Sequence, residues 1–353
     1  MPSPLAAAGR TPDHDDRLAA LGGGLALARV TAVHRGGLEL VTDTGPLAGF
    51  TTGRLRHSAA TRADLPGVGD WVAVDPESGA VHHVLPRASA LVRAARDGYE
   101  AQVLAANVDL VVVVASMTRE LSVGRVERML TLAGDAPADA LVVLSKADLD
   151  PDPAARVAEM RAALGGAAPV LPASTVAGTG LDAVAAMLGP GLTGVLIGAS
   201  GVGKTSLLNR LAGGEPATGR IRASDDRGRH TTTWRELVPL AGGGVVIDTP
   251  GLKLPRIWEQ AQGLTTVFSD VDAIGARCRF ADCRHEGEPG CAVAEALADG
   301  RVSPERLAAL EQLRREEAWA ESRRDPRAGR ARKAASRRVH REMRRTMRAK
   351  GRG

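Results

Sequence analysis

Short apolar runs separated by turn residues occupy the first quarter of the chain. Between residues 25 and 88 these runs are punctuated by Gly, Pro and Ser, a pattern typical of short strands joined by tight turns. Five short strands in this length predict a small β-barrel, OB-like as the first choice and SH3-like as the second. The expected strands are Ala28–Val33, Leu38–Thr42, Leu47–Thr51, Asp70–Val74 and Val81–Leu85.

From residue 109 the apolar runs become continuous, and helical stretches lie between most of them. Continuous runs are typical of parallel strands buried on both faces, so this region is predicted to be an α/β domain. The expected strands are Asp109–Val114, Ala140–Leu144, Val170–Pro172, Val195–Ile197, Arg235–Leu240 and Val245–Ile247. The expected helices are Gly124–Ala133, Pro153–Leu164, Leu181–Leu188 and Ser206–Leu211.

One strand-to-helix junction carries a phosphate-binding loop. Its residues fit G-x-x-x-x-G-K-[ST] and lie between an apolar run and a helical one, which disfavours a chance match in a Gly-rich turn. We expect the backbone N–H groups and the helix dipole to hold a phosphate, Lys204 to reach the β- and γ-phosphates, and Thr205 to bind Mg²⁺. The nucleotide-binding residues are Gly198, Ala199, Ser200, Gly201, Val202, Gly203, Lys204, Thr205 and Ser206.

Two further motifs follow expected strands. In Asp248-Thr249-Pro250-Gly251, the Asp248 carboxylate would hold Mg²⁺ and the N–H of Gly251 would face the γ-phosphate. Ser145-Lys146-Ala147-Asp148 resembles the guanine motif Asn-Lys-x-Asp. Its carboxylate accepts from guanine N1–H and N2, donors that adenine lacks, and discriminates by roughly 10⁴. Ser145 replaces the usual Asn and is expected to brace the loop less well; a plain polar turn is the alternative reading.

The order of these motifs is unusual. In an ordinary small GTPase the base motif comes last, whereas here residues 145–148 precede the phosphate loop. Moving residues 109–190 to follow Gly251 restores the ordinary order, so we predict a circular permutation that leaves strand neighbours unchanged. Asp248–Gly251 then lies at the exit of the domain, and whatever follows is tied directly to it.

All three cysteines of the chain lie with one histidine in a stretch of fourteen residues: Cys278, Cys283, His285 and Cys291. Three thiolates and one imidazole complete a tetrahedral shell, so we predict one structural Zn²⁺. Three buried free cysteines are the weaker alternative, because the surrounding residues are polar. So few and so clustered cysteines fit a reducing compartment.

The charge of the 353-residue chain is uneven. Its formal net charge is +5, but residues 321–353 hold 14 Lys and Arg against three acidic residues, which leaves −6 for the rest. A basic tail predicts a polyanion partner, and a merely solvated tail is the alternative. No apolar run approaches the ~18 residues of a membrane span, and no signal peptide is recognisable, so we predict a cytoplasmic protein without membrane contact.

These features predict a multidomain protein. The helices expected near the C-terminus are Val293–Leu297 and Pro304–Trp319. The barrel is expected to contact RNA through Arg54, Arg56 and Arg62 more than by stacking on Phe50 and Trp71, unless it is only a spacer. The divisions are 1–24 disordered, 25–90 an OB-like barrel, 91–257 a circularly permuted P-loop GTPase domain, 258–320 an α-helical zinc-binding domain, and 321–353 a basic tail.

With these motifs the chain resembles the circularly permuted bacterial GTPase family known as ribosome small-subunit-dependent GTPase A. The resemblance covers residue 29 to about 300. It rests on the motifs above together with Ala105–Asp109 and Gly228-Arg229-His230-Thr231-Thr232. It implies an OB fold, a permuted GTPase domain, a zinc domain, and a role late in small-subunit maturation, with GTP hydrolysis stimulated by the subunit.

The segment 220–233 is polar and broken by glycine, as an order–disorder switch should be. Thr232 is the expected second Mg²⁺ hydroxyl, with Thr231 as the fallback. Leu252 stands where many GTPases place a water-orienting Gln, so the resemblance implies that role for His230; a histidine contacting RNA is the alternative. Lys204 and Thr232 complete the expected catalytic set.

Two other functional classes stay open. A P-loop ATPase or kinase with RNA-binding ends would favour ATP despite Asp148, and a scaffold would bind nucleotide but scarcely hydrolyse it. The favoured partners are the small ribosomal subunit and its rRNA, and we expect a monomer.

Overall fold

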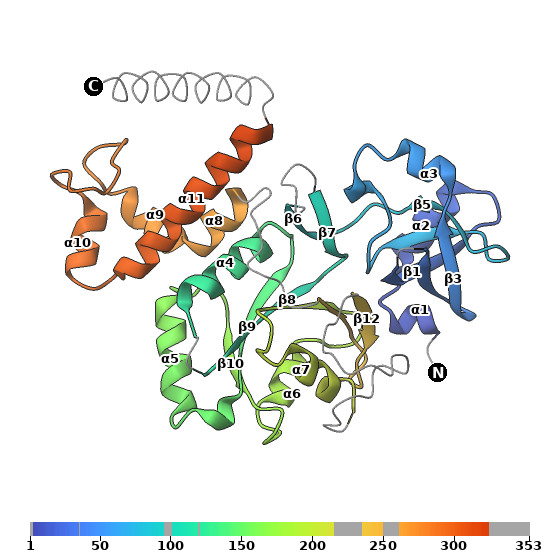
Figure 1. Cartoon of the computed structure of the whole chain (residues 1–353), viewed down its shortest axis with the longest axis horizontal. Coiled ribbons are helices and arrows are strands. Elements are labelled where there is room, and N and C mark those ends of the chain that lie inside the picture. Colours follow the sequence, from blue (N-terminus) through green and yellow to red (C-terminus); the bar gives the residue numbers. More distant parts are fainter. Residues whose placement is uncertain are drawn as a thin grey trace, which may run out of the picture.

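The computed structural model describes residues 3–34, 36–94, 101–118, 121–214, 235–249 and 261–324. Within these residues a β-barrel, a central α/β domain and a group of C-terminal helices lie side by side along the long axis (Figure 1). The predictions for His230, Thr231, Thr232 and Gly251, and for the basic tail beyond residue 324, fall outside the described residues.

The barrel matches the predicted strands closely. Its five strands pair in the order β1-β2-β3-β5-β4, and β4 returns to β1, which closes the barrel. The β3–β5 pair is parallel and the others are antiparallel, which is the OB-like arrangement. Alternate residues such as Val30, Leu40, Val72 and Val81 fill its interior. The strands are β1 Ala26–Val33, β2 Leu38–Thr42, β3 Gly45–Thr51, β4 Trp71–Val74 and β5 Ala80–Val84, with α3 Gly53–Ser58 and a 3₁₀ turn at Arg62–Asp64 between β3 and β4.

The N-terminal segment is ordered where the structure describes it, so the predicted disorder of residues 1–24 is wrong there. Helices α1 (Pro4–Ala7) and α2 (Pro12–Leu21) each begin at a proline that follows a Ser or Thr, which suits a helix start. Leu5 is fully buried against Leu27, Trp71 and Leu85. The helices therefore gain their stability from the barrel and not from an apolar period of their own.

Trp71 is consequently unavailable for base stacking. Its side chain is 2 % exposed, the His14 ring lies 4.3 Å from it, and the Arg29 guanidinium lies 5.0 Å from its centroid. Phe50, in contrast, is 45 % exposed. Of the two aromatic residues available for stacking in the barrel, only Phe50 faces solvent.

The central sheet has the predicted six strands, in the order β10-β9-β8-β11-β13-β12. All neighbours are parallel except β12, which is antiparallel to β13. One pair, Ala32 with Glu236, joins β12 to β1, so the sheet continues into the barrel. The strands are β8 Leu110–Ser116, β9 Asp139–Ser145, β10 Val170–Ala173, β11 Thr193–Ile197, β12 Glu236–Pro239 and β13 Val245–Asp248.

Helices cover both faces of this sheet, which explains its continuous apolar strands. Alternate β8 residues illustrate this, because Val111 and Val113 belong to one core and Val112 and Val114 to the other. The first core is covered by α4 (Val123–Gly134) and α5 (Pro153–Ala163), and the second by α6 (Leu181–Ala186) and α7 (Lys204–Leu211). A hairpin that we did not predict, β6 (Ala90–Ala94) with β7 (Ala101–Ala106), connects the barrel to the sheet.

Four helices follow the sheet: α8 Ala261–Val267, α9 Ser269–Gly275, α10 Ala292–Ala298 and α11 Pro304–Arg324. The last two confirm the predicted helices, whereas α8 and α9 were not predicted. Helix α8 packs directly on α4 because each helix has a glycine at the contact, Gly134 on α4 and Gly263 on α8. A Cβ on Gly263 would lie 2.0 Å from the Thr131 carbonyl oxygen. No described helix is long and apolar enough to cross a membrane.

A buried arginine ties these helices to the α/β domain. Arg306 of α11 is 4 % exposed, pairs with Glu127 of α4 and, at 2.7 Å, with Asp270 of α9, and donates to the Val267 carbonyl at 2.9 Å. Burial raises the pKa of Glu127 to about 7, although Arg306 opposes the shift. The desolvation of Glu127 thus outweighs the stabilisation of its charged form by Arg306, as is common for buried pairs.

Replacing Arg306 alone by Met is therefore expected to destabilise the chain by about 3–5 kcal/mol, because Glu127 is left as a buried, unpaired acid. The double variant R306M/E127M should recover most of this loss. Urea unfolding followed by circular dichroism measures both. A double variant as unstable as the single one would show that Arg306 stabilises the chain mainly through its hydrogen bonds to backbone carbonyl oxygens and its ion pair with Asp270.

Candidate nucleotide and metal sites

The phosphate loop joins β11 to α7, as predicted. Gly203 is the N-cap of α7 with φ +95°, a conformation that favours glycine. A Cβ on Gly198 would lie 2.4 Å from the Val114 carbonyl oxygen, so the loop turns tightly over β8. Both positions need glycine for backbone reasons, and the loop amides stand at a helix N-terminus, where anions bind.

Lys204 is held inside this loop. Its Nζ donates to the carbonyl oxygens of Gly198 and Ala199, both at 2.9 Å, and the side chain is buried. Burial lowers the pKa of Lys204, against the opposing charge of Asp248. An ammonium has three donors, so one remains for an anion above the loop.

A hydroxyl and a carboxylate meet beside the lysine. Thr205 Oγ1, at the start of α7, lies 3.5 Å from Asp248 Oδ2, at the end of β13. Oxygen ligands of these two kinds suit Mg²⁺. They meet because α7 follows β11, and β11 pairs with β13, which ends at Asp248. The donor set therefore fits the ion that the sequence motifs imply.

Ser145 braces the phosphate loop despite its short side chain. Its Oγ lies 2.5 Å from the Val202 carbonyl oxygen and 3.1 Å from that of Ala115. A hydroxyl has one proton, so it can fully donate to only one of these carbonyls at a time. The motif on β9 thus contacts the loop on β11 directly across β8, although 57 residues separate Ser145 from Val202.

Asp148 is positioned by a residue that the sequence reading missed. Ser174, fully buried at the end of β10, donates to Asp148 Oδ1 at 2.5 Å and accepts from the Ala177 N–H at 2.9 Å. Strand β10 is the neighbour of β9, with Ala173 opposite Ser145. The sequence did contain a signal for Ser174, namely a polar residue directly after an apolar strand. Asp148 and Lys204 thus lie at the same edge of the sheet.

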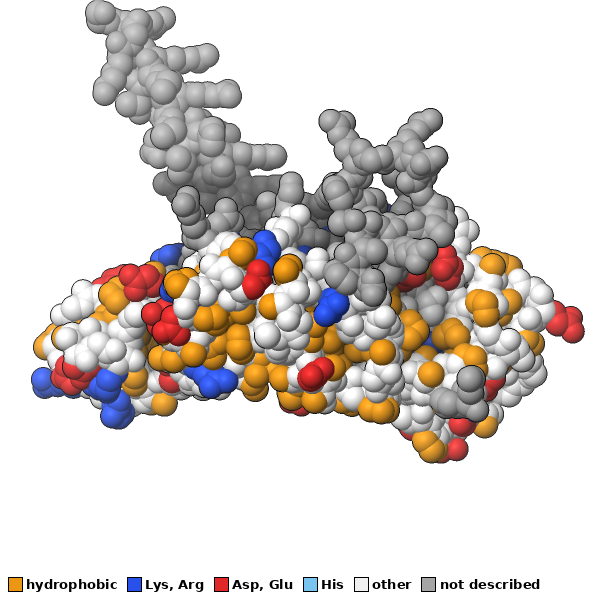
Figure 2. All heavy atoms as spheres, turned by 90° about the horizontal axis from the view of Figure 1, so that it is seen from below, with side chains coloured by type: hydrophobic (Ala, Val, Ile, Leu, Met, Phe, Trp, Pro, Cys, Tyr) orange, Lys and Arg blue, Asp and Glu red, His pale blue; other side chains and the backbone are white. Residues whose placement is uncertain are grey.

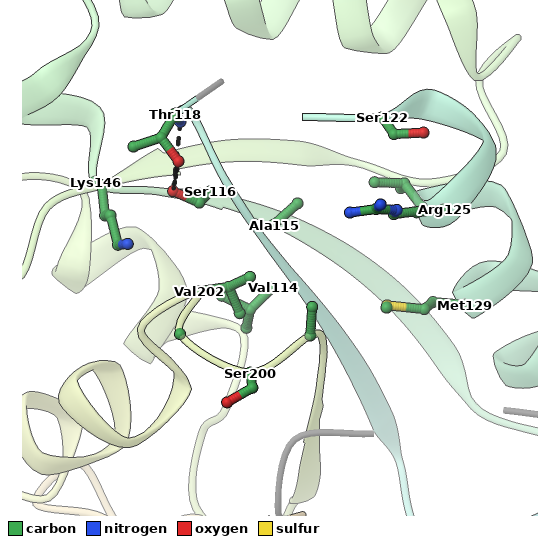
Figure 3. Close-up of a pocket in the computed structure, with 13 residues that line it drawn as sticks. Val114, Ala115, Ser116, Thr118, Ser122, Arg125, Met129, Lys146, Ser200 and Val202 are labelled. Carbon is green, nitrogen blue, oxygen red and sulfur yellow. Dashed lines mark hydrogen bonds between the residues drawn. The ribbon is translucent and has the colours of Figure 1, made fainter. Parts of the chain in front are cut away.

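A cavity of about 250 Å³ lies between the phosphate loop and α4. Figure 3 shows Arg125 and Met129 of α4 on one side of it and Lys146 on the other, with the Ser116 and Thr118 hydroxyls bonded to each other at 3.0 Å. Lys146 adopts a left-handed backbone with φ +59°. The cavity is thus lined by the phosphate loop and the base motif as well as by α4 and β8.

The predicted metal ligands are brought together in the C-terminal region. The ligand atoms of Cys278, Cys283, His285 and Cys291 all lie within 4.8 Å of one another. His285 Nδ1 lies 3.4 to 3.7 Å from the three sulfurs, and the Sγ atoms of Cys278 and Cys291 are 4.0 Å apart. A tetrahedral Zn²⁺ with ordinary bond lengths spaces such ligands about 3.5–3.8 Å apart. The group can therefore hold a metal, and its thiolate-rich set suits zinc.

Comparison with known proteins agrees with this geometry. The family model of the RsgA GTPase matches residues 84–258. A protein of Opitutus terrae named small ribosomal subunit biogenesis GTPase RsgA is 43 % identical over 340 residues, covering 92 % of each chain. A Streptomyces avermitilis protein of the same name is 45 % identical over 300 residues, covering 83 % of this chain and 80 % of its own.

Solved structures agree as well. The crystal structure of YjeQ from Thermotoga maritima superposes with a TM-score of 0.61 at 28 % identity, covering 83 % of this chain and 99 % of its own. The structure of YloQ, described as a circularly permuted GTPase, has a TM-score of 0.57 at 22 % identity, covering 83 % and 95 %, and supports the fold alone. The resemblance inferred from the motifs is confirmed: the chain belongs to the RsgA GTPase family.

Proposed function

We propose that the chain binds GTP and hydrolyses it to GDP and phosphate in late maturation of the small ribosomal subunit, with stimulation by the subunit. The observation that carries this proposal is the bond from Ser145 to Val202, which joins the base motif to the phosphate loop at one edge of the sheet. The names of the relatives supply the ribosomal context. A P-loop ATPase or kinase is not favoured, because adenine lacks the N1–H and N2 donors from which the Asp148 carboxylate would accept.

The site residues that the structure describes each have a role in this proposal. The loop amides and Lys204 hold the phosphates, and Asp148, oriented by Ser174, accepts from guanine N1–H and N2. Mg²⁺, when bound through Thr205 and Asp248, offsets charge on the phosphates. Thr232 as a further Mg²⁺ ligand, the Gly251 N–H at the γ-phosphate and His230 as the residue that orients water stay predictions.

The remaining parts are proposed to contact the subunit. Cys278, Cys283, His285 and Cys291 would hold one structural Zn²⁺, and the barrel, the zinc segment and the basic tail would contact rRNA. A role in maturing the small ribosomal subunit supports a cytoplasmic location. A monomeric state stays a prediction.

Turnover measured alone, with purified small subunits and with large subunits tests the function. We expect stimulation by small subunits only. Stimulation by neither subunit, or equally by both, would contradict the proposal.

The variant H230A is expected to lose most of the subunit-stimulated turnover, about 10²-fold or more, while its affinity for GDP stays within a few fold. The reason is that water would no longer be oriented, since Leu252 lacks a polar group. Unchanged stimulated turnover would remove the catalytic assignment and leave the RNA-contacting alternative.

The variant S145A is expected to weaken GDP binding about fivefold to tenfold, because the Val202 carbonyl loses its donor, a loss of about 1 kcal/mol. S145N, which restores an amide at this position, is the matched control and should bind at least as tightly as the unmodified chain. Titration with a fluorescent GDP analogue measures both. Equal affinity of S145A and the unmodified chain would show that the brace is dispensable.

A further inference from the structure

An exposed aromatic ring lies in the middle of the metal-binding segment. This ring belongs to Phe280, which is 43 % exposed and is one of only three phenylalanines in the chain. It lies between Cys278 and Cys283, and its carbonyl accepts from the Cys283 N–H at 3.3 Å, while the Arg279 N–H donates to Gly290 at 3.0 Å. The backbone on both sides of the ring is thus held by hydrogen bonds and by the ligand cluster. Such a ring is presented to solvent on a rigid support.

A hollow of about 410 Å³ adjoins this ring. It adjoins the metal-binding group, because Cys278, Cys283 and His285 line it, and its other lining residues include Phe280, Asp272 and Arg314. Arg314 and Asp272 are paired at 2.7 Å but remain half-exposed, so both keep unused hydrogen-bonding capacity toward the hollow. A planar ligand beside the metal-binding group would find an aromatic ring together with a hydrogen-bond donor and an acceptor.

One guanidinium group lies beside the ring, and two more arginines lie close to it in the sequence. The Arg279 guanidinium lies 5.5 Å from the Phe280 ring centroid, within cation–π range. Arg277, Arg279 and Arg284 are exposed, and none of them forms an ion pair within the described part of the chain. The nearby Glu288 carboxylate accepts from the backbone N–H groups of Arg284 and Glu286, both at 2.8 Å. The acid is thus engaged by the backbone, and the arginines keep their charge for a partner.

The end of the molecule formed by the C-terminal helices carries many charged side chains of both signs, whereas the middle of the same face is mostly apolar and uncharged (Figure 2). The positive members near Phe280 are arginines, and arginine beside an aromatic ring is the combination that binds single-stranded nucleic acid. An apolar protein segment on the same ring would leave these guanidinium groups and the Arg314–Asp272 pair unmatched.

We propose that Phe280 and the adjoining hollow bind one unpaired nucleobase of RNA, with the base stacked on the ring, Arg314 and Asp272 at its edge, and Arg277 or Arg284 on the flanking phosphates. This inference rests on the proposed function, since the small subunit would supply the RNA. It goes beyond it by naming the chemical group recognised and the residues that hold it.

The test uses the full zinc-loaded chain and a single-stranded RNA 12-mer that contains 2-aminopurine, whose fluorescence falls when the base stacks. Phe280→Leu keeps an apolar side chain but removes the aromatic face, and Phe280→Tyr keeps that face. We expect Phe280→Leu to lose the fluorescence change and to bind RNA about tenfold more weakly, and Phe280→Tyr to retain both. Val176→Ala, at an exposed position on another part of the surface, is the control and should change neither.

Zinc content and unstimulated GTP turnover are measured for each variant and should be unchanged, which separates a lost contact from a misfolded segment. Equal fluorescence change for Phe280→Leu and the unmodified chain, or none for either, would overturn the proposal. Weaker binding of Phe280→Leu to small subunits with unchanged RNA stacking would also overturn it, in favour of a protein partner. In all these cases subunit-stimulated turnover of the unmodified chain tests the proposed function separately.

Discussion

Replacing Asp148 by Asn is expected to lower the affinity for GTP by about 10³-fold and to raise the affinity for xanthosine triphosphate. Guanine presents two donors, N1–H and N2, to the carboxylate, whereas an amide offers one acceptor and one donor. Xanthine has a carbonyl oxygen where guanine has its N2 amine, so the amide complements xanthine and leaves a mismatch with guanine. A site built for hydrogen bonds rejects a mismatched partner by several powers of ten.

Competition between fluorescent GDP and each triphosphate measures this exchange of preference. The variant Ser174→Ala is the matched control: it removes the hydroxyl that donates to Asp148 Oδ1 but keeps the carboxylate, so GTP binding should fall only about fivefold with no gain for xanthosine triphosphate. Tight GTP binding by Asp148→Asn would show that the carboxylate does not read the base, and preference for ATP by the unmodified chain would restore the ATPase alternative.

Removing the metal is expected to unfold the segment around residues 270–300 while leaving nucleotide binding intact. The four ligand atoms lie within 4.8 Å of one another, and the short helices α9 and α10 flank them. Structural zinc contributes about 10–16 kcal/mol to the folding of small zinc domains, far more than such short helices supply. The phosphate loop has its own core between β11 and α7, so it should not depend on the ion.

Hydrogen exchange of residues 270–300, measured before and after chelation and again after Zn²⁺ is restored, reports this change directly. His285→Ala should behave like the chelated chain, whereas His285→Cys, which keeps four ligands, should retain one Zn²⁺ and slow exchange. Slow exchange in the metal-free chain would show that Val293 and its buried neighbours hold the segment without a metal.

The hydrophobic pattern was sufficient to predict an element wherever that element's own residues decide which of its faces are buried. The run from Val111 to Val114 is apolar at every position, which requires cover on both faces, and the structure supplies α4 and α5 on one side and α6 and α7 on the other. Short apolar runs between turn residues likewise predicted the five barrel strands. The metal ligands were readable because all four are close together in the sequence.

Periodicity failed where a distant surface supplies the stabilisation. Helices α1 and α2 lack an apolar stripe, yet Leu5 is buried against the barrel. Trp71 has an aromatic side chain that could stack on a base, but α1, α2 and Arg29 cover it. Ser174 is one polar residue among many until β10 pairs with β9 and places it beside Asp148.

The sequence by itself determined the phosphate loop, the base motif, the permuted order and the ligand set, because each depends on residue types at fixed short spacings. Only the tertiary structure decided that Ser145 reaches Val202, that Ser174 holds Asp148, that Arg306 ties α11 to α4 and that Phe280 stays exposed. These contacts join segments far apart in the chain, or depend on what the fold leaves uncovered. Distances between such segments follow from strand pairing and helix packing, which no local pattern of residues records.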